Sequence, residues 1–547
     1  MRRFYIMKNN ITYIAGLLLS GMIGFSSCTD SFESYNTNEA GFNNESKKQD
    51  FNYYTIPLSI VQQGVYFNYD WGSGKNWTFQ TMQNLGSDLF SGYVHDFNPF
   101  NDGKNNSTYY MMDGWNGSSW DNTYGYIMPE VQKSEQINEN INWGFYGITK
   151  ILKVELMHRI SDLYGPIIYT QFGSKTGSKP DTQKEAYTAF FKDLDEGIAK
   201  IRKFVTDNPN MENFASFDVF MPEGKKNYAQ WIKFANSLRL RLAIRLSVVD
   251  PGTAAIEVEK AMDPDAGGLL EANNDIVAVS TALGFTNPFG EINKGWGEVF
   301  LNANLESYMK GYEDPRLEKY FVKAEGVKGE TSVINYAGTY KGIRPGTGFS
   351  HKNYAGHSKS TITQTTSAVL MTPAEIWFLR AEAALRKFTS EDPKDCYEKG
   401  VRASFAQWGA DGADKFLASD NAPADYKDAF NAEYNVKAAG TITPEWDANA
   451  DPDVKLERII TQKWLAMFPE GCEAWAEQRR TGFPKLFEVM VNQSGGTVDS
   501  KIGPRRLNFF VSIKTTNPEQ YQQLVDALGG VDNCGTRLWW DTGRNFQ

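Results

Sequence analysis

One stretch, "MTPAEIWFLRAEAALRKF" at residues 371–388, constrains the fold more than any other. Thr372 can cap a helix, Pro373 suits its first turn, and Glu375 completes a capping box. Apolar residues then recur at helical spacing, and the alanines among them are small enough for another helix to approach closely. A second helix is predicted at residues 394–408. Two antiparallel helices within about 35 residues are typical of a tetratricopeptide unit.

Five further segments carry helical periodicity, so the chain is predicted to be mainly α-helical. They are residues 144–163, 184–205, 228–249, 301–312 and 454–468. Within the third, "LRLRLAIRL" alternates apolar and polar residues, a pattern that by itself indicates a strand. The helical spacing upstream and the absence of Gly and Pro favour a helix. Its arginines are then expected to pair with carboxylates of neighbouring helices: Arg239, Arg241 and Arg245.

The N-terminus has the order of a secretion signal, because basic residues precede an apolar run at residues 11–25. A membrane-spanning helix needs about 20 apolar residues, so this run is expected to be cleaved or anchored. "FSSC" at residues 25–28 resembles a bacterial lipobox, although Phe25 stands where leucine is usual. An ordinary signal peptide cut near Ser26 is the alternative, and a start at Met7 would give a more compact signal.

These features predict three parts of the chain. Residues 1–27 are a lipoprotein signal peptide, and Cys28 is the lipidated first residue of the mature protein. Residues 28–50 are a flexible tether, acidic and polar enough to stay solvated. No long linker divides residues 51–547, which are therefore predicted to form a single body.

Charge and cysteine content exclude two classes of protein. Without residues 1–27 the formal charge is −13, because 53 Lys and Arg face 66 Asp and Glu. Such a surface repels phosphate backbones, so nucleic acid is not an expected partner. Only three cysteines follow Cys28. This number is too small for a disulfide-stabilised secreted protein, although one disulfide pair is possible. The three cysteines are Cys396, Cys472 and Cys534.

Aromatic residues gather at residues 66–126, where they make up 16 of 61 positions against 14% in the whole chain. They lie among Gly, Asn, Ser and Asp, which favour turns and irregular loops, so this segment and residues 280–300 are predicted to be loop insertions. Aromatic rings edged by amides and hydroxyls suit sugar rings and extended peptides. We expect most of these rings to pack inward and a few to line a site. The candidates are Trp71, Trp77, Trp115, Trp120 and Trp296.

No motif predicts catalysis, a cofactor or a metal. The chain has four histidines, too few to assemble His-dependent catalysis easily. Glu155 and His158 form Glu-x-x-His, half of a di-metal carboxylate motif, but no second copy exists, so a satisfied helix histidine is expected. No zinc-ligand spacing and no phosphate loop occur. Carboxylate pairs for glycoside hydrolysis stay open, because their spacing is a three-dimensional property.

A C-terminal segment, "ERIITQKWLAMFPEGCEAWAEQRRTGFP" at residues 457–484, resembles the SusD/RagB family of nutrient-binding lipoproteins. It has a helix with Gln-Lys-Trp, a Glu-Gly turn, and a second helix ending in Arg-Arg-Thr-Gly. The Ala-rich helix at residues 371–388, "DLYGPIIY" at Asp162, "DPRLEKYF" at Asp314 and the ending "GTRLWWDTG" are also similar to family elements. The chain is identified as a member of this family.

The resemblance implies a mainly α fold: an α-superhelical scaffold of tetratricopeptide-like helix pairs, with a loop-rich half that carries the ligand site. It implies a non-enzymatic surface lipoprotein that binds oligosaccharides or oligopeptides as a lid over a SusC-type TonB-dependent transporter. Asp30 and Glu33 resemble the acidic signal that sends such lipoproteins to the outer face of the outer membrane. Family ligand residues are not fixed by a motif, so none is transferred to this chain.

Two alternatives from other classes remain open. A secreted all-α glycoside hydrolase would turn over a glycan, and a structural tetratricopeptide-type adaptor would bind a protein partner but no small ligand.

Overall fold

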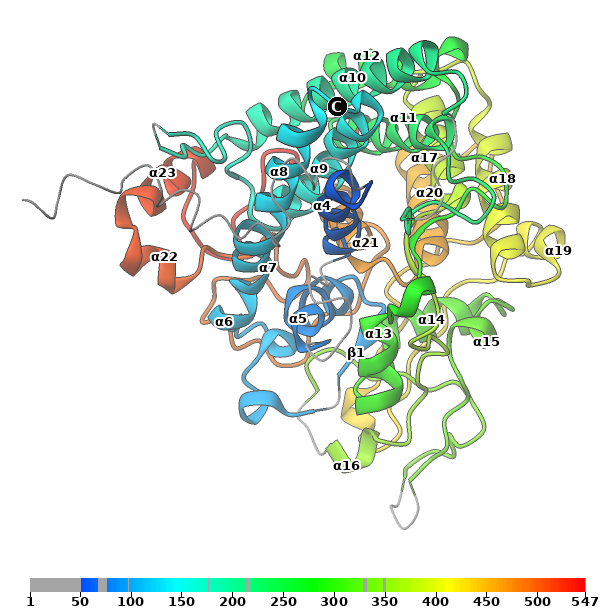
Figure 1. Cartoon of the computed structure of the whole chain (residues 1–547). Coiled ribbons are helices and arrows are strands. Elements are labelled where there is room, and N and C mark those ends of the chain that lie inside the picture. The colour runs from blue at the N-terminus through cyan, green and yellow to red at the C-terminus, as the bar shows by residue number, and fades with distance from the viewer. Residues whose placement is uncertain are drawn as a thin grey trace, which may run out of the picture. The chain divides into compact units, whose positions relative to one another are not determined.

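Four consecutive helix pairs in the computed structural model form the scaffold of the chain (Figure 1). They are α9 (Trp143–Tyr164) with α10 (Gln183–Asp207), α11 (Tyr228–Arg245) with α12 (Pro251–Met262), α17 (Pro373–Leu385) with α18 (Pro393–Gln407), and α20 (Pro452–Met467) with α21 (Gly471–Thr481). The two helices of each pair contact each other, and α10–α11, α11–α17 and α17–α20 contacts join successive pairs. The predicted mainly α fold with tetratricopeptide-like pairs is confirmed.

The structure describes residues 51–66, 76–96, 98–175, 177–211, 217–327, 332–347 and 351–546. The predictions for the signal peptide, Cys28, the tether and Trp71 lie outside these residues. Ile56–Gln547 form one compact unit. None of the helices among the described residues combines the length and apolar character that a membrane crossing requires.

Local sequence signals place the helix starts. Thr372 caps α17 by accepting a hydrogen bond from the Glu375 backbone N–H at 3.3 Å, and Pro373 occupies the first turn, as predicted. Every segment that was predicted to be helical contains a helix. For the segment at residues 301–312 this is α14 (Ala303–Gly311).

The alternating stretch "LRLRLAIRL" lies in α11, so the helical interpretation is confirmed. Its leucines and arginines are all buried, because α9, α10, α12 and α17 contact this helix. The alternation of apolar and polar residues therefore does not mark a solvent face opposite a core face. For this reason the pattern does not indicate a strand here.

The three arginines of α11 pair with carboxylates, as predicted. Arg239 binds Asp195, with 2.5 Å between Nη2 and Oδ1, and also pairs with Glu257. Arg241 forms a two-pronged pair with Glu375 of α17, at 2.8 and 2.7 Å. These bonds compensate the cost of burying three guanidinium groups.

Arg245 continues this pairing into α21. Its Nη2 lies 2.5 Å from Glu473 Oε2, and Glu477 is its second partner. Glu477 also accepts from Arg480, which in turn binds Glu382 of α17 at 2.7 Å. Lys463 of α20 lies 3.2 Å from Glu477. We call Arg245, Glu382, Lys463, Glu477 and Arg480 the ion network; it ties four scaffold helices together.

The described part of the aromatic segment, at residues 76–96 and 98–126, is largely helical, which corrects the prediction of irregular loops there. It contains α5 (Asn76–Phe79), the π-helix η1 (Gln80–Asp88), the short 3-10 turns η2 (Phe100–Gly103) and η3 (Asn106–Thr108), α6 (Asp113–Asn116), α7 (Ser118–Asn122) and the π-helix η4 (Thr123–Ile127). Met82 and Leu85 of η1 are buried, and η1 contacts α21. Packing on the scaffold overrides the local turn preference of Gly, Asn and Ser.

Two small antiparallel sheets accompany the helices. In one, Val94 of β1 (Val94–His95) pairs with Leu301 of β3 (Phe300–Leu301). In the other, Val279 of β2 (Val277–Val279) pairs with Ala368 of β4 (Ala368–Met371), directly before α17. The remaining helical elements are α4 (Phe51–Gly64), α8 (Met128–Asn138), η5 (Pro264–Ala266), η6 (Ala282–Gly284), α13 (Pro288–Gly290), η7 (Glu291–Trp296), α15 (Leu317–Tyr320), α16 (His351–Tyr354), α19 (Ala413–Leu417), η8 (Ala432–Tyr434), α22 (Val511–Thr516) and α23 (Pro518–Leu528).

Cys396, Cys472 and Cys534 are buried and free. The pair that the sequence left possible is therefore absent among these three thiols. Burial raises the pKa of each thiol, with Cys472 at about 12 and Cys534 at about 11.

Candidate functional site

Two of the predicted tryptophans lie exposed on neighbouring elements. Trp77 of α5 is 51% exposed and Trp296, the last residue of η7, is 39% exposed. α5 contacts both η7 and α13, so two elements more than 200 positions apart in the sequence lie side by side. Gly297 follows with φ +73°, a left-handed conformation that ends the π-helix just after Trp296.

A fixed carboxylate accompanies these rings. Glu298 Oε2 accepts from Gln80 Nε2 at 2.6 Å, and its Oε1 accepts from Asn98 Nδ2 at 3.1 Å. Gln80 begins η1, directly after α5, while Glu298 follows η7. We call Trp77, Gln80, Asn98, Trp296 and Glu298 the Trp77–Trp296 face. It combines two apolar rings with a carboxylate whose position two amides hold.

Trp115 and Trp120, the other two predicted tryptophans that the structure describes, do not join this face in the same way. Trp120 is 5% exposed, and its ring packs against Tyr124, Tyr164 and Phe509 at centroid distances of 4.7 to 6.0 Å. It is a packing residue that no ligand can stack upon. Trp115 on α6 is half-buried.

Trp115 stands edge-on to Phe100, with 5.4 Å between the ring centroids. Its helix α6 contacts η1, so it lies on an element next to the one that carries Gln80. Part of its surface remains accessible, but the ring is already used for packing. The expectation that most rings of the segment pack inward holds for Trp120 and in part for Trp115.

Sequence reasoning missed Tyr126 of η4, which is exposed. η4 contacts α7, and α7 contacts η1, where Thr81 Oγ1 and Ser118 Oγ lie 2.8 Å apart. Tyr126 is therefore a further exposed aromatic residue on the contacting elements α5, η1, α7 and η4, the first of which carries Trp77. Its place in the aromatic-rich segment is the signal in the sequence that could have identified it.

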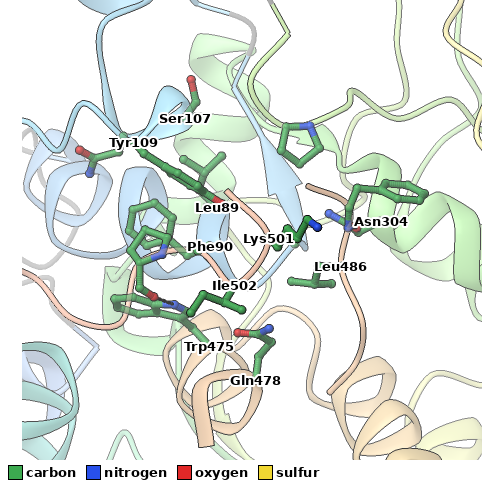
Figure 2. Close-up of a pocket in the computed structure, with 16 residues that line it drawn as sticks. Leu89, Phe90, Ser107, Tyr109, Asn304, Trp475, Gln478, Leu486, Lys501 and Ile502 are labelled. Carbon is green, nitrogen blue, oxygen red and sulfur yellow. Dashed lines mark hydrogen bonds between the residues drawn. The ribbon is translucent and has the colours of Figure 1, made fainter. Parts of the chain in front are cut away.

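Figure 2 shows a narrow cavity beside η1, with Phe90, Trp475, Gln478 and Ile502 around it. Its volume is about 40 Å³, room for water and not for a sugar ring. Trp475 and Phe90 pack at 5.0 Å between centroids. This cavity is a packing gap between α21, the segment that follows η1, η3 and the loop residues 486–487 and 501–504.

Glu155 and His158 are structural, as expected. His158 is buried, with Nε2 3.2 Å from Glu155 Oε2 and Nδ1 3.5 Å from Asp162 Oδ2. Burial lowers the pKa of His158, but the two carboxylates outweigh it and raise the pKa above its usual value. In the described part of the chain, no group of three or more His, Cys, Asp or Glu side chains is arranged to hold a metal ion.

The Glu-Gly turn of the C-terminal segment also has a structural basis. Glu470 Oε1 accepts from the Glu473 backbone N–H at 3.3 Å and binds Arg159 at 3.1 Å. A side chain at Gly471 would lie 2.2 Å from Asp88 Oδ1 of η1, so only glycine fits. The segment that carries the family resemblance thus joins η1, α9 and α21 rather than forming a ligand site.

Comparisons with known proteins agree with this architecture. The chain matches the family model described as SusD-like, SusD and RagB outer membrane lipoprotein, over residues 34–541. It is 45% identical to a SusD homologue from Bacteroides vulgatus over 91% of this chain and 99% of that chain, with a TM-score of 0.85.

A chitin-binding SusD homologue from Flavobacterium johnsoniae is 38% identical over 90% of this chain and 99% of that chain, with a TM-score of 0.83. A SusD homologue from Bacteroides uniformis is 36% identical over 90% and 100%, with a TM-score of 0.79. None of the curated proteins compared with the chain matches it. Because family model and structures both cover most of its length, the chain belongs to the SusD-like family of SusD and RagB outer membrane lipoproteins.

Proposed function

We propose that this lipoprotein captures oligosaccharides through the Trp77–Trp296 face and delivers them, as a lid, to a SusC-type TonB-dependent transporter. The observation that carries the proposal is the pair of exposed tryptophans on contacting elements, beside a carboxylate held by two amides. An indole stacks on the C–H face of a sugar ring, while the carboxylate accepts hydrogen bonds from its hydroxyl groups.

Chitooligosaccharides are the first ligand class to test. A relative with 38% identity over 90% of this chain is described as chitin-binding, which supports N-acetylated sugars over other neutral glycans. Oligopeptides are the alternative, since extended peptides also suit aromatic rings edged by amides.

The expected affinity is weak. Each stacked ring that buries roughly 50–100 Å² contributes roughly 1–3 kcal/mol at about 25 cal/mol per Å². Association costs at least about 4 kcal/mol, which two stacked rings only just offset, so stacking alone predicts binding no tighter than millimolar, and hydrogen bonds must supply any further affinity. Weak capture permits release, and a transporter that encloses the ligand on a second side would raise the apparent affinity.

Membrane attachment is proposed to occur through Cys28, with residues 28–50 as the tether and the protein facing the cell exterior. Mass spectrometry of the mature N-terminus tests this directly: a lipidated Cys28 is expected. An unmodified chain that starts beyond Cys28 would remove the anchor from the proposal.

The binding experiment is calorimetric titration with chitohexaose. A Trp77→Ala/Trp296→Ala double variant is expected to bind at least about tenfold more weakly than the wild type, from the loss of two stacked rings. Trp377→Ala is the matched control, because Trp377 is a half-buried tryptophan of the scaffold helix α17. Equal binding by the wild type and the double variant would refute the site.

Two further measurements address the other parts of the proposal. Turnover of chitohexaose or of another glycan in a panel would favour the hydrolase alternative over simple capture. Isolation of the protein from outer membranes together with a TonB-dependent transporter supports the delivery role, and its isolation without one contradicts that role.

A further inference from the structure

A cavity of about 570 Å³ lies at the C-terminal end of α21. Seven cationic side chains line it, against one carboxylate, Glu488. The chain as a whole carries a formal charge of −10, so the charge of this wall is opposite in sign to that of the chain. Charges further away than about 8 Å are screened at physiological ionic strength, so the local cations decide what enters.

Nearby carboxylates compensate only part of this charge. Lys437 binds Asp425 at 2.7 Å on the outer side of the cavity. Arg505 and Arg537 share a single carboxylate, that of Asp541, at 2.6 and 2.5 Å. One aspartate between two guanidinium groups leaves a net positive charge at this wall.

Lys485 and Arg480 each form an ion pair with a carboxylate. Lys485 lies 3.3 Å from Glu457, and Arg480 belongs to the ion network described above. These two residues therefore shape the cavity and add little to its excess charge.

Arg479 stands out at the inner end. It is 1% exposed, and its guanidinium packs on Trp475, 3.7 Å from the ring centroid. Its hydrogen bonds go to backbone carbonyls, including those of Asp162 at 2.6 Å and Arg505 at 2.9 Å. Among the described residues no carboxylate lies within ion-pair distance of it, and its Nη2 has no partner.

Burial lowers the pKa of Arg479 to about 9, and the charge of Arg505 adds to this against the attraction of Asp162. A buried cation without a carboxylate partner is costly, and an anionic ligand group would relieve that cost.

Lys501 supplies a further free cation at the rim. It is exposed, and its ammonium makes no ion pair with any residue that the structure describes. The apolar side chains of Leu486, Phe487 and Ile502 line the same cavity. These three side chains also line the narrow cavity of Figure 2.

We propose that this basic cleft, defined by Lys437, Arg479, Lys501, Arg505 and Arg537, binds the carboxylate of a uronic-acid residue in an acidic oligosaccharide. The guanidinium fork matches the geometry of a carboxylate, and the apolar wall can cover the C–H face of the sugar ring. Its volume lies within the range of small-molecule sites. The saccharide part of this proposal rests on the proposed glycan capture, whereas the anion site rests on the charges alone.

The test uses trigalacturonate and its trimethyl ester, in which three methyl groups replace the negative charges of the three carboxylates. Calorimetry is expected to show binding of the acid at 50 mM NaCl, at least tenfold weaker binding of the ester, and weaker binding of the acid at 300 mM NaCl. A Lys501→Gln/Arg537→Gln variant is expected to lose at least tenfold in affinity for the acid.

The control variant is Lys394→Gln/Arg402→Gln, which removes two exposed cations from α18. Thermal melts of both variants verify folding. Equal affinity for acid and ester, an equal loss in the control variant, or binding of a tripeptide with a free C-terminus in place of trigalacturonate would each overturn the proposal.

This result separates from that of the Trp77–Trp296 face. Binding of trigalacturonate by the Trp77→Ala/Trp296→Ala variant at wild-type affinity supports the basic cleft even if chitohexaose binds nowhere. If the Trp77→Ala/Trp296→Ala variant loses trigalacturonate binding and the Lys501→Gln/Arg537→Gln variant keeps it, the basic cleft is not the site that binds trigalacturonate.

Discussion

Trp77 and Trp120 lie 43 positions apart in one aromatic-rich segment, and the structure gives them opposite roles. Trp77 projects from α5 into solvent, whereas Trp120 is enclosed by the rings of Tyr124, Tyr164 and Phe509. Both tryptophans stand beside polar residues in the sequence. The difference arises only when α7 packs against its neighbours.

The two residues should therefore respond differently to the same substitution. Trp120→Ala removes a buried indole and is expected to lower the free energy of unfolding by about 3–5 kcal/mol. Trp77→Ala is expected to change it by less than about 0.5 kcal/mol, because the ring is half exposed. Urea unfolding followed by circular dichroism measures both. A larger loss at Trp77 than at Trp120 would contradict the packing described here.

Asp88 is a second residue of interest, because burial shifts the pKa of its carboxyl group. It is fully buried in η1, and burial raises the pKa of its carboxyl to about 7, against a hydrogen bond from Gln83 and with repulsion from Glu470. The folded state thus holds the proton more tightly than the unfolded chain does. Asp88 favours folding most below pH 4, and this contribution is lost as the pH rises to about 7.

Asp88→Asn should consequently stabilise the protein at high pH. A neutral amide of the same shape avoids a buried charge, so a gain of about 1–3 kcal/mol is expected at pH 8.5. The gain should be smaller at pH 5, where the aspartate is protonated in the folded protein although it is ionised in the unfolded chain. Thermal melts at the two pH values measure the difference. The same change in melting temperature at both would contradict the raised pKa.

At the scale of elements, the ion network is what fixes α11, α17, α20 and α21 to one another. Glu477 accepts from Arg245, Lys463 and Arg480, and these charge pairs, despite the cost of burial, hold its pKa well below the usual range. Glu477→Gln leaves these cations undercompensated and is expected to cost about 3–5 kcal/mol of stability.

The control for this variant is Glu398→Gln in α18, whose partners Lys394 and Arg402 are exposed. It is expected to cost at most about 1 kcal/mol, since surface ion pairs contribute little. Urea unfolding of both variants gives the comparison. Equal losses would mean that the network does not stabilise the helix junction.

The buried carboxylates of the scaffold helices, two of them in the ion network, also predict an acid sensitivity. Glu155, Asp162, Glu382 and Glu477 all have a pKa below the usual value, because nearby cations outweigh burial. Their contribution is present above about pH 4.5 and is lost as the pH falls through their folded-state pKa. The melting temperature should fall steeply below pH 4, less so in Glu477→Gln. An identical slope in both proteins would contradict this origin.

Sequence periodicity predicts the helices well because their signals are local. Thr372, Pro373 and Glu375 lie within four positions, and the structure uses them as predicted. The Trp77–Trp296 face has no such signal, since Glu298 meets Gln80 and Asn98 across about 200 positions. A tryptophan's neighbours in sequence do not indicate whether it will be covered, as Trp120 demonstrates.

At the scale of the whole molecule, two surfaces differ in chemistry. The Trp77–Trp296 face offers rings and one carboxylate, and the basic cleft offers cations on an apolar wall. The overall negative charge predicts a mild bias against polyanions, yet the cleft reverses that bias locally. Membership in the SusD-like family fixes the scaffold, while the ligand depends on these two surfaces.

The Trp77–Trp296 face is proposed to hold the glycan. A crystal structure of the protein grown with chitohexaose tests this proposal most directly. We expect sugar rings stacked on Trp77 or Trp296, with a hydroxyl group within hydrogen-bond distance of Glu298. An ordered oligosaccharide that touches neither tryptophan, or crystals that never take up chitohexaose at millimolar concentration, would contradict it.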